Sequence, residues 1–251
     1  MQEKLKRNNL EIGDYFDCGW EIFQKNFMTF LSLALLINLP IAIVAEFLPL
    51  PLTPTGEIAW TPEDAKIWGI FYIIATIFGI WTTIATLIVS ENAVFDRSLD
   101  VKTALQSALP TIAIVVLMSL LSGILVGLGL IFFVIPGIYI AISLAFVTQF
   151  IVLRHRGLGS IAKSWSLVKG QWWKVFWRLF VIGFALFLLL LALTIVASFI
   201  SIVFSAFPIA QNVINVVFSV TFGLLIYLGI VIQNMLFLNL DYVRNNPDRP
   251  I

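Results

Sequence analysis

The chain has 251 residues, of which 60% are hydrophobic and only 12% charged, with a formal net charge of +1. Soluble domains carry about 25% charged residues, so this composition excludes a water-soluble single domain, and the net charge gives no indication of nucleic-acid binding. Repeated uncharged runs longer than about 18 residues predict an all-α, polytopic membrane protein, because a helix satisfies its own backbone hydrogen bonds in lipid. The single Cys18 has no partner for a disulfide or a metal site, so we expect no cofactor.

Residues 1–26 are polar and contain an amphipathic helix. At 100° per residue one face is apolar and the opposite face carries most of the acidic residues. We expect this helix, capped by Asp14, to lie at the membrane interface. No short apolar segment with a small-residue cleavage site follows a basic start, so the first span is expected to act as its own insertion signal. The apolar face consists of Ile12, Tyr15, Gly19, Ile22 and Phe23.

Six apolar stretches follow, and we predict that each crosses the membrane as a helix. Six spans place both termini on one side, and Lys66 is then the only one of the fifteen Lys and Arg on the other side. Because positively charged loops stay in the cytoplasm, we predict a multi-pass protein of a bacterial plasma (inner) membrane with both termini cytoplasmic. The predicted spans are Phe27–Leu48, Trp68–Ser90, Pro110–Phe133, Gly137–Leu153, Trp177–Phe207 and Val213–Phe237.

Local signals predict where these helices begin, bend and end. Asn38–Pro40 predicts a kink in the first span, and Thr61-Pro62 predicts the start of the next helix. Ile135-Pro136-Gly137 predicts a sharp break between the third and fourth spans. The fifth stretch is 31 residues long, more than the ~20 needed to cross. It is therefore expected to tilt, to project beyond the bilayer, or to break near Ser198–Ser205.

Three short amphipathic helices share a spacing, and each is followed by two spans. Asp14, Asp100 and Ser160 are predicted to cap them, with apolar residues one, five and eight positions later. This pattern predicts three pseudo-repeats, each an interfacial helix plus a two-span hairpin, over residues 12–95, 97–153 and 157–243. Side-chain identity hardly repeats, so coincidence is the alternative. An odd number of two-span units implies parallel rather than inverted repeats.

Arg154–Arg178, between the fourth and fifth spans, carries six Lys and Arg and no Asp or Glu. Each cation near an anionic leaflet contributes about 1 kcal/mol, and Trp favours the headgroup level, so we predict that this segment contacts anionic lipid headgroups. The alternative is that its charges only fix the topology. Single-stranded nucleic acid is not expected, because the Trp side chains are needed at the interface. The candidate lipid contacts are Arg154, Arg156, Lys163, Trp165, Lys169, Trp172, Trp173, Lys174 and Arg178.

Two motifs lie on either side of the fourth span. Residues 135–139 read IPGIY, and residues 162–170 read A-x-S-W-x-L-x-x-G and are followed by aromatic residues. With these motifs Phe132–Arg178 resembles bacterial integral membrane proteins named after the membrane domain of glycerophosphoryl diester phosphodiesterase, and the related YciC-like proteins. The resemblance implies an all-helical six-span domain of no established activity.

His155-Arg156-Gly157 matches the start of the catalytic signature of that phosphodiesterase, but we do not carry the activity over. The catalytic domain of the enzyme is a barrel of about 250 residues, for which this chain has no room. No Asp or Glu occurs between Arg154 and Asn239, and His155 is the only histidine, so no catalytic or metal site can be built around it. We therefore predict that the protein is not an enzyme.

Polar side chains also occur near the inner ends of the second, fourth and sixth spans. The simpler interpretation is hydrogen bonding between helices, at about 0.6–2 kcal/mol each. If the repeat holds, we expect these side chains to converge near its axis and to line a substrate or headgroup pocket. The candidate polar cluster is Glu91, Gln149, Gln233 and Asn234.

These patterns together predict a non-enzymatic membrane module that interacts with lipid or serves a membrane-protein partner as a scaffold. The alternative is a transporter or flippase for a small or amphipathic substrate, with its path along the polar cluster. A solid apolar core between the second, fourth and sixth spans would exclude that path. The spans carry no acid or base at mid-membrane, where such residues mark ion pathways.

Overall fold

The computed structural model describes residues 4, 7, 10–48 and 59–245. Every regular element in the described residues is helical. Six of the helical segments are long and apolar enough to cross a membrane: Phe27–Phe47, Pro62–Val94, Val101–Phe132, Val134–Arg154, Trp172–Val203 and Pro208–Asn245. The prediction of an all-α, six-span integral membrane protein is confirmed.

Helix α2 (Ile12–Lys25) has the predicted apolar face, but protein covers that face. Tyr15, Gly19 and Ile22 are buried against α12 (Pro208–Asn245). A Cβ on Gly19 would lie 2.5 Å from Cγ1 of Ile232, so only glycine allows this approach. The cap prediction was wrong, because Glu11 is the N-cap and Asp14 occupies the third helical position of a reciprocal capping box.

The first span is interrupted where Asn38–Pro40 predicted a kink. It consists of α3 (Phe27–Leu33), a π-helical turn η1 (Ala34–Asn38) and α4 (Leu39–Phe47). Proline has no N–H and its ring crowds the carbonyl four residues earlier, so the ladder widens there and Leu39 N–H donates to Ala34 O. The π turn directs Asn38 at Tyr227 of α12, whose hydroxyl donates to Asn38 Oδ1 at 3.0 Å.

The next two helices begin at the residues predicted to cap them. Thr61 caps α5 (Pro62–Val94) and accepts from Asp64 N–H at 3.1 Å. Asp100 caps α6 (Val101–Ala108) and accepts from Thr103 N–H at 3.2 Å. A short 3₁₀ turn, η2 (Leu109–Thr111), then leads into α7 (Ile112–Phe132).

The break between the third and fourth spans occurs earlier than predicted. Phe133 alone is extended, and α8 (Val134–Ser143) starts before Pro136, which the first turn of a helix tolerates. Gly137 does not form the turn but packs against Gly129 of α7. A Cβ added to Gly129 would lie only 2.9 Å from Cα of Gly137. The fourth span therefore begins at Val134 and is 21 residues long rather than 17.

The fourth span is itself broken before α9 (Val147–Arg154). Ser164, on α10 (Ser160–Val168), bridges the break. Its hydroxyl donates to Ser143 O at 2.8 Å and accepts from Phe146 N–H at 3.2 Å. Both backbone groups lie at the interruption, where the regular helical hydrogen bonds are broken.

Ser160 does not cap α10. A 3₁₀ turn, η3 (Gly157–Gly159), precedes the helix, Gly159 is the N-cap, and the Ser160 side chain is buried. Two of the three caps on which the repeat was aligned are therefore wrong, while the division into three units stays a prediction. Gly170, with φ of +89°, separates α10 from α11 (Trp172–Val203), which runs without a break through Ser198.

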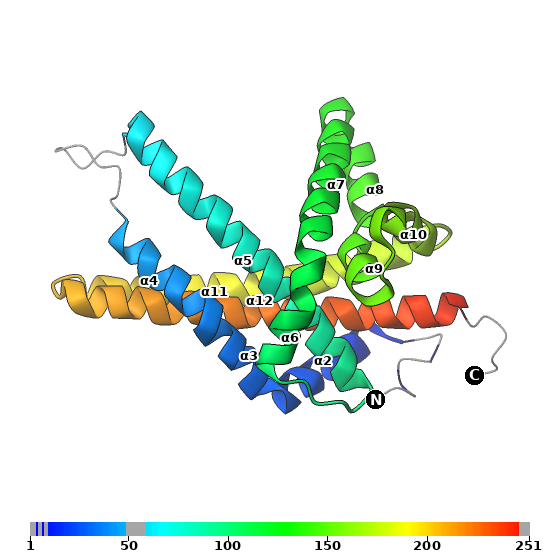
Figure 1. The fold of residues 1–251 in the computed structure, drawn as a ribbon, viewed down its shortest axis with the longest axis horizontal. Coiled ribbons are helices and arrows are strands. Elements are labelled where there is room, and N and C mark those ends of the chain that lie inside the picture. The colour runs from blue at the N-terminus through cyan, green and yellow to red at the C-terminus, as the bar shows by residue number, and fades with distance from the viewer. Residues whose placement is uncertain (1–3, 5–6, 8–9, 49–58, 246–251) are drawn as a thin grey trace.

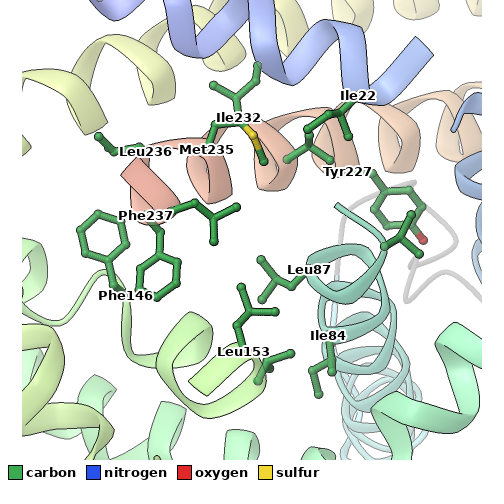
Figure 2. Close-up of a cluster of buried hydrophobic side chains, with 14 of the residues drawn as sticks. Ile22, Ile84, Leu87, Phe146, Leu153, Tyr227, Ile232, Met235, Leu236 and Phe237 are labelled. Carbon is green, nitrogen blue, oxygen red and sulfur yellow. The ribbon is translucent and has the colours of Figure 1, made fainter. Parts of the chain in front are cut away.

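The helical hairpins diverge from one core. In Figure 1 the α7–α8 hairpin and α5 point away from the long antiparallel pair α11 and α12. Near the middle of α12, side chains from α2, α5 and α9 meet those of α12, including Ile22, Leu87, Leu153 and Phe237 (Figure 2). We call this the core end of the molecule; the opposite ends of the hairpins, at Phe47, Phe133 and Phe204–Phe207, are the tips.

Candidate functional site

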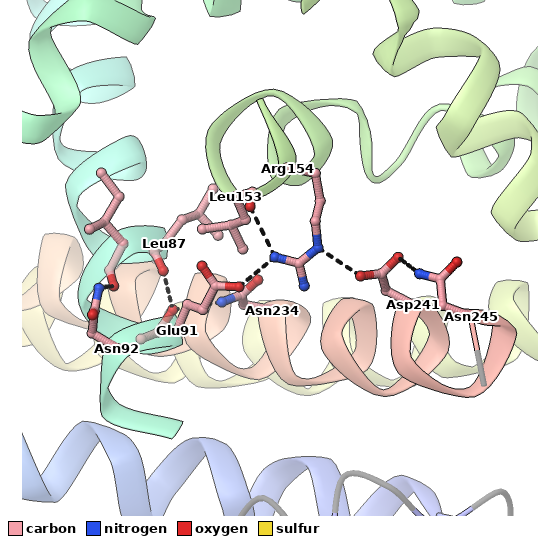
Figure 3. Close-up of polar contacts among 10 residues, drawn as sticks. Leu87, Glu91, Asn92, Leu153, Arg154, Asn234, Asp241 and Asn245 are labelled. Carbon is pink, nitrogen blue, oxygen red and sulfur yellow. Dashed lines mark hydrogen bonds and ion pairs between the residues drawn. The ribbon is translucent and has the colours of Figure 1, made fainter. Parts of the chain in front are cut away.

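Arg154 ties together the ends of the second, fourth and sixth spans (Figure 3). Its Nη1 donates to Glu91 Oε1 of α5 at 2.6 Å, and its Nε donates to Asp241 Oδ2 of α12 at 2.8 Å. The carboxylate side chains are 19% and 10% exposed, and the guanidinium also lies over the Phe237 ring. Charge-assisted bonds are the stronger kind, so this triad locks three spans at one level.

The triad changes the interpretation of Arg154. The sequence predicted a lipid contact, but two carboxylates neutralise its charge, so it is not free for a headgroup. Asp241 was missed because it lies just beyond the predicted sixth span. A signal existed, since it is the first Asp or Glu after Asp100 and directly follows an apolar helix.

The predicted polar cluster comes together only in part. Glu91 and Asn234 lie near each other in Figure 3, and Asn234 Nδ2 donates to Ser90 Oγ at 2.8 Å. Gln233 does not join this pair, because its Nε2 donates to Ala145 O at 3.3 Å. It borders a cavity of about 300 Å³ that is lined mainly by Leu and Ile side chains of α11 and α12. Gln149 is buried.

The packed core fills the space between these spans. Leu87, Leu153 and Phe237 occupy it (Figure 2), and Phe237 packs edge-on against Phe150 with ring centroids 5.1 Å apart. This packing gives no support to a substrate path along Glu91, Gln149 and Gln233, which stays a prediction. Gln149 Oε1 and Asn234 Oδ1 find no partner among the described residues.

Arg178 also contacts protein rather than the membrane surface. Its Nη2 donates to Leu10 O at 3.1 Å, and its guanidinium lies 5.4 Å from the centre of the Tyr15 ring. The Tyr15 hydroxyl donates to Asn239 Oδ1 of α12 at 2.8 Å. Burial raises the pKa of Tyr15 to about 12, so this phenol is a neutral donor throughout the physiological range. These contacts fasten α2 to α11 and α12.

Two of the predicted tryptophans pack on the fourth span. Trp172 stacks on Tyr139 and donates from Nε1 to Tyr139 O at 3.2 Å, and Trp165 meets the edge of the same ring. Trp173 and Trp177 are 68% and 54% exposed. The basic segment thus divides into tryptophans that hold the fold and tryptophans that face outward.

Four of the predicted cations keep exposed side chains. Arg156, Lys163, Lys169 and Lys174 are exposed, and no ion pair joins them to any carboxylate in the described part of the chain. Lys163 and Lys169 lie on and just after α10, and Lys174 lies in the first turn of α11. These four cations without an ion pair thus lie in one stretch of the chain, which also carries the exposed Trp173 and Trp177.

A small cavity lies under this surface, between α9, α10 and α12. Its volume is about 160 Å³, well above the roughly 10–15 Å³ that one water needs. Arg244 contributes to its wall and donates to Leu167 O and Lys169 O at the end of α10. Asp241, already paired with Arg154, is the only carboxylate among its described lining residues, so its field favours an anion. The cavity is lined by Phe150, Arg154, Arg156, Lys163, Ser166, Leu167, Asp241, Arg244 and Asn245.

Comparison of the chain with protein-family models, with curated proteins and with solved structures finds no match. Among the described residues, no group of three or more His, Cys, Asp and Glu side chains could hold a metal ion. The geometry of the site is therefore the basis for a functional proposal.

Proposed function

We propose that this multi-pass membrane protein is a non-enzymatic module of a bacterial plasma membrane that binds anionic lipid headgroups at the cytoplasmic surface. The carrying observation is the cluster of exposed cations on α10 and the start of α11, without carboxylate partners in the described residues and flanked by outward-facing Trp173 and Trp177. The proposal includes a cytoplasmic side for both termini, and its support is that every Lys and Arg in the described helices except Lys66 belongs to the core end.

Elementary electrostatics supports this proposal. Arg156, Lys163, Lys169 and Lys174 would each gain about 1 kcal/mol near an anionic leaflet. Tryptophan favours the boundary between headgroups and hydrocarbon, so Trp173 and Trp177 would set the depth at which the cations sit. The cavity beside Arg156 and Lys163 offers room for the charged end of one headgroup.

The two motifs on which the proposed resemblance to the phosphodiesterase-associated membrane domains rests lie together in the structure. The residues that carry it contact one another: Tyr139 of IPGIY packs on Trp165 and Trp172, and Ser164 holds the broken fourth span. The two motifs would thus be the two halves of one structural unit that presents the basic surface. That role needs no catalytic residue.

The test is the binding of a fluorescent phosphatidylglycerol to the purified protein in neutral micelles. The triple variant Lys163→Gln, Lys169→Gln, Lys174→Gln should bind it more weakly, and wild-type binding should fall as salt rises. The matched control neutralises Lys66, Arg97 and Lys102, which are exposed, have no ion pair in the described residues and lie outside the basic segment, and it should keep wild-type affinity. Equal affinity in both triple variants would refute the role of the basic segment.

A scaffold role and a transport role are the competing proposals. A scaffold would use the exposed apolar sides of α7 and α11, whose Leu120, Ile131 and Phe187 face outward; these faces are also what a lipid-embedded helix requires. Transport would use a different place, the polar cavity between α11 and α12 toward the tips.

A further inference from the structure

Two facing stripes of polar side chains run along α11 and α12 toward their tips. Thr194, Ser198 and Ser201 follow each other at intervals of four and three residues on α11. On α12, Gln211, Asn215 and Ser219 follow at intervals of four. Such spacing places each set on one helix face, and both sets line a cavity of about 800 Å³ that Asn38 and Gly79 help to close. We call these six residues with their cavity the polar seam.

The polar seam is not a closed helix interface. Polar residues in spans ordinarily hydrogen-bond across helices, but the one such bond between the two stripes is long, from Ser201 Oγ to Asn215 Oδ1 at 3.5 Å. Thr194 and Ser198 instead donate to carbonyls of their own helix, both at 2.8 Å, and their side chains are exposed. Their oxygens therefore keep free acceptor capacity facing the cavity.

The charges in and around the cavity favour an uncharged head group. Asn38, which lines the cavity, accepts from the hydroxyl of Tyr227, and Tyr227 continues into the packed core of Figure 2. Toward the tips, Asn215 Nδ2 donates to Glu46 Oε2 of α4 at 3.3 Å. No Lys or Arg occurs among the described residues that line the cavity. An anionic group would therefore find no counter-charge among these lining residues and would lie near Glu46, which accepts from the lining Asn215, while hydroxyl groups would find amide and hydroxyl partners.

The rest of the wall is apolar. Ile41, Leu193, Phe218 and Phe222 provide most of it, and this combination of an apolar wall with a few convergent polar groups is typical of small-molecule sites. Lipid surrounds these helices, so a molecule with an apolar chain can enter from the bilayer.

We propose that the polar seam binds an amphiphile with an uncharged, hydroxyl-bearing head, whose hydroxyls bond to Ser198, Ser201 and Asn215 while its chain lies along Phe218 and Phe222. The site shares no residue with the basic surface and is independent of the lipid-binding role proposed above. It differs from that surface in its ligand, because it selects against the phosphate-bearing heads that the basic surface attracts.

Cysteine labelling tests whether the seam holds water and a ligand. Ser198→Cys and, in a second protein, Ser201→Cys place a thiol in the cavity with little change in volume. Phe199→Cys is the matched control, because Phe199 is 68% exposed on the same helix but does not line the cavity. The native Cys18 is buried, and the wild-type chain measures its background. The proteins are held in lipid nanodiscs and treated with a water-soluble maleimide.

We expect labelling at position 198 or 201 to be about tenfold faster than at position 199, because only a hydrated thiol ionises and reacts readily. Octyl glucoside, at a concentration too low to form micelles, should slow labelling in the cavity several-fold, and octyl phosphate with the same chain should not. Equal rates at all three positions would show that no hydrated cavity exists. Fast labelling that neither amphiphile slows, or that octyl phosphate slows as much, would also overturn the proposal.

Discussion

The core end and the tips of the molecule use polar residues in opposite ways. At the core end, Arg154, Glu91 and Asp241 satisfy one another, and aromatic and aliphatic side chains fill the space around them. Toward the tips, Ser198 and Asn215 face a cavity with few cross-helix bonds. The difference indicates that stability is concentrated where the spans meet, while the tips have room for a ligand.

The largest loss of stability is expected for Arg154→Met. It leaves Glu91 and Asp241 as unpaired charges that are mostly buried, and breaking such a pair costs several kcal/mol. Because Arg154 is 32% exposed, we expect a loss of about 3 kcal/mol, at the lower end of that range. The free energy of unfolding, followed by circular dichroism during titration with SDS in mixed micelles, measures it. Arg156→Met, which removes an exposed cation without an ion pair, should leave the value unchanged.

The second-largest loss of stability is expected for Ser164→Ala. It removes the bridge across the broken fourth span and leaves Phe146 N–H and Ser143 O without their partner. A buried group left unsatisfied costs about 1–3 kcal/mol. Ser166→Ala, whose hydroxyl donates to Lys163 O of the same helix, is the control. If both variants unfold at the same SDS fraction, Ser164 does not hold the break.

Tyr15→Phe should cost about 1 kcal/mol through the lost hydrogen bond to Asn239. The pH dependence adds a second signature. The pKa of Tyr15 is raised from 10.0 to about 12, so its contribution is fully present below pH 10 and is lost as pH rises through 12. The melting temperature of the wild type should therefore fall more steeply than that of the variant between pH 10 and pH 12. Parallel curves would contradict a buried neutral phenol.

The smallest effect is expected at the tips. Ser201→Ala removes only a 3.5 Å contact to Asn215, so the free energy of unfolding should change by less than about 0.6 kcal/mol. A loss as large as that of Ser164→Ala would mean that the polar seam is a structural interface, and the contrast between the two ends would fail.

The sequence predicts the spans well because each is an uncharged run whose backbone must be satisfied internally. It also predicts the caps at Thr61 and Asp100, where one side chain bonds to a neighbouring N–H, and the interruption at Asn38–Pro40. These features depend on contacts within a few residues. The break after Ser143 was not predictable in this way, because the residue that supports it, Ser164, lies on another helix.

The candidate site shows the same limit. Composition indicates that Arg154–Arg178 is basic and aromatic, but it does not indicate which cations are already paired. Arg154 and Arg178 are engaged by Asp241, Glu91 and Leu10, residues far away in the chain. The polar seam was missed although its spacing is visible in the sequence, because Ser and Thr that bond to their own helix look the same as those that also face a cavity.

The most direct test of the central claim measures how phosphatidylglycerol changes the melting temperature of the purified protein. The account predicts that the wild type and the triple variant Lys163→Gln, Lys169→Gln, Lys174→Gln melt at the same temperature in neutral lipid, because these side chains take no part in the core. Added phosphatidylglycerol should then raise the melting temperature of the wild type by mass action, and should raise that of the variant much less. An equal rise in both proteins would contradict the claim that the free cations of the basic segment bind anionic headgroups.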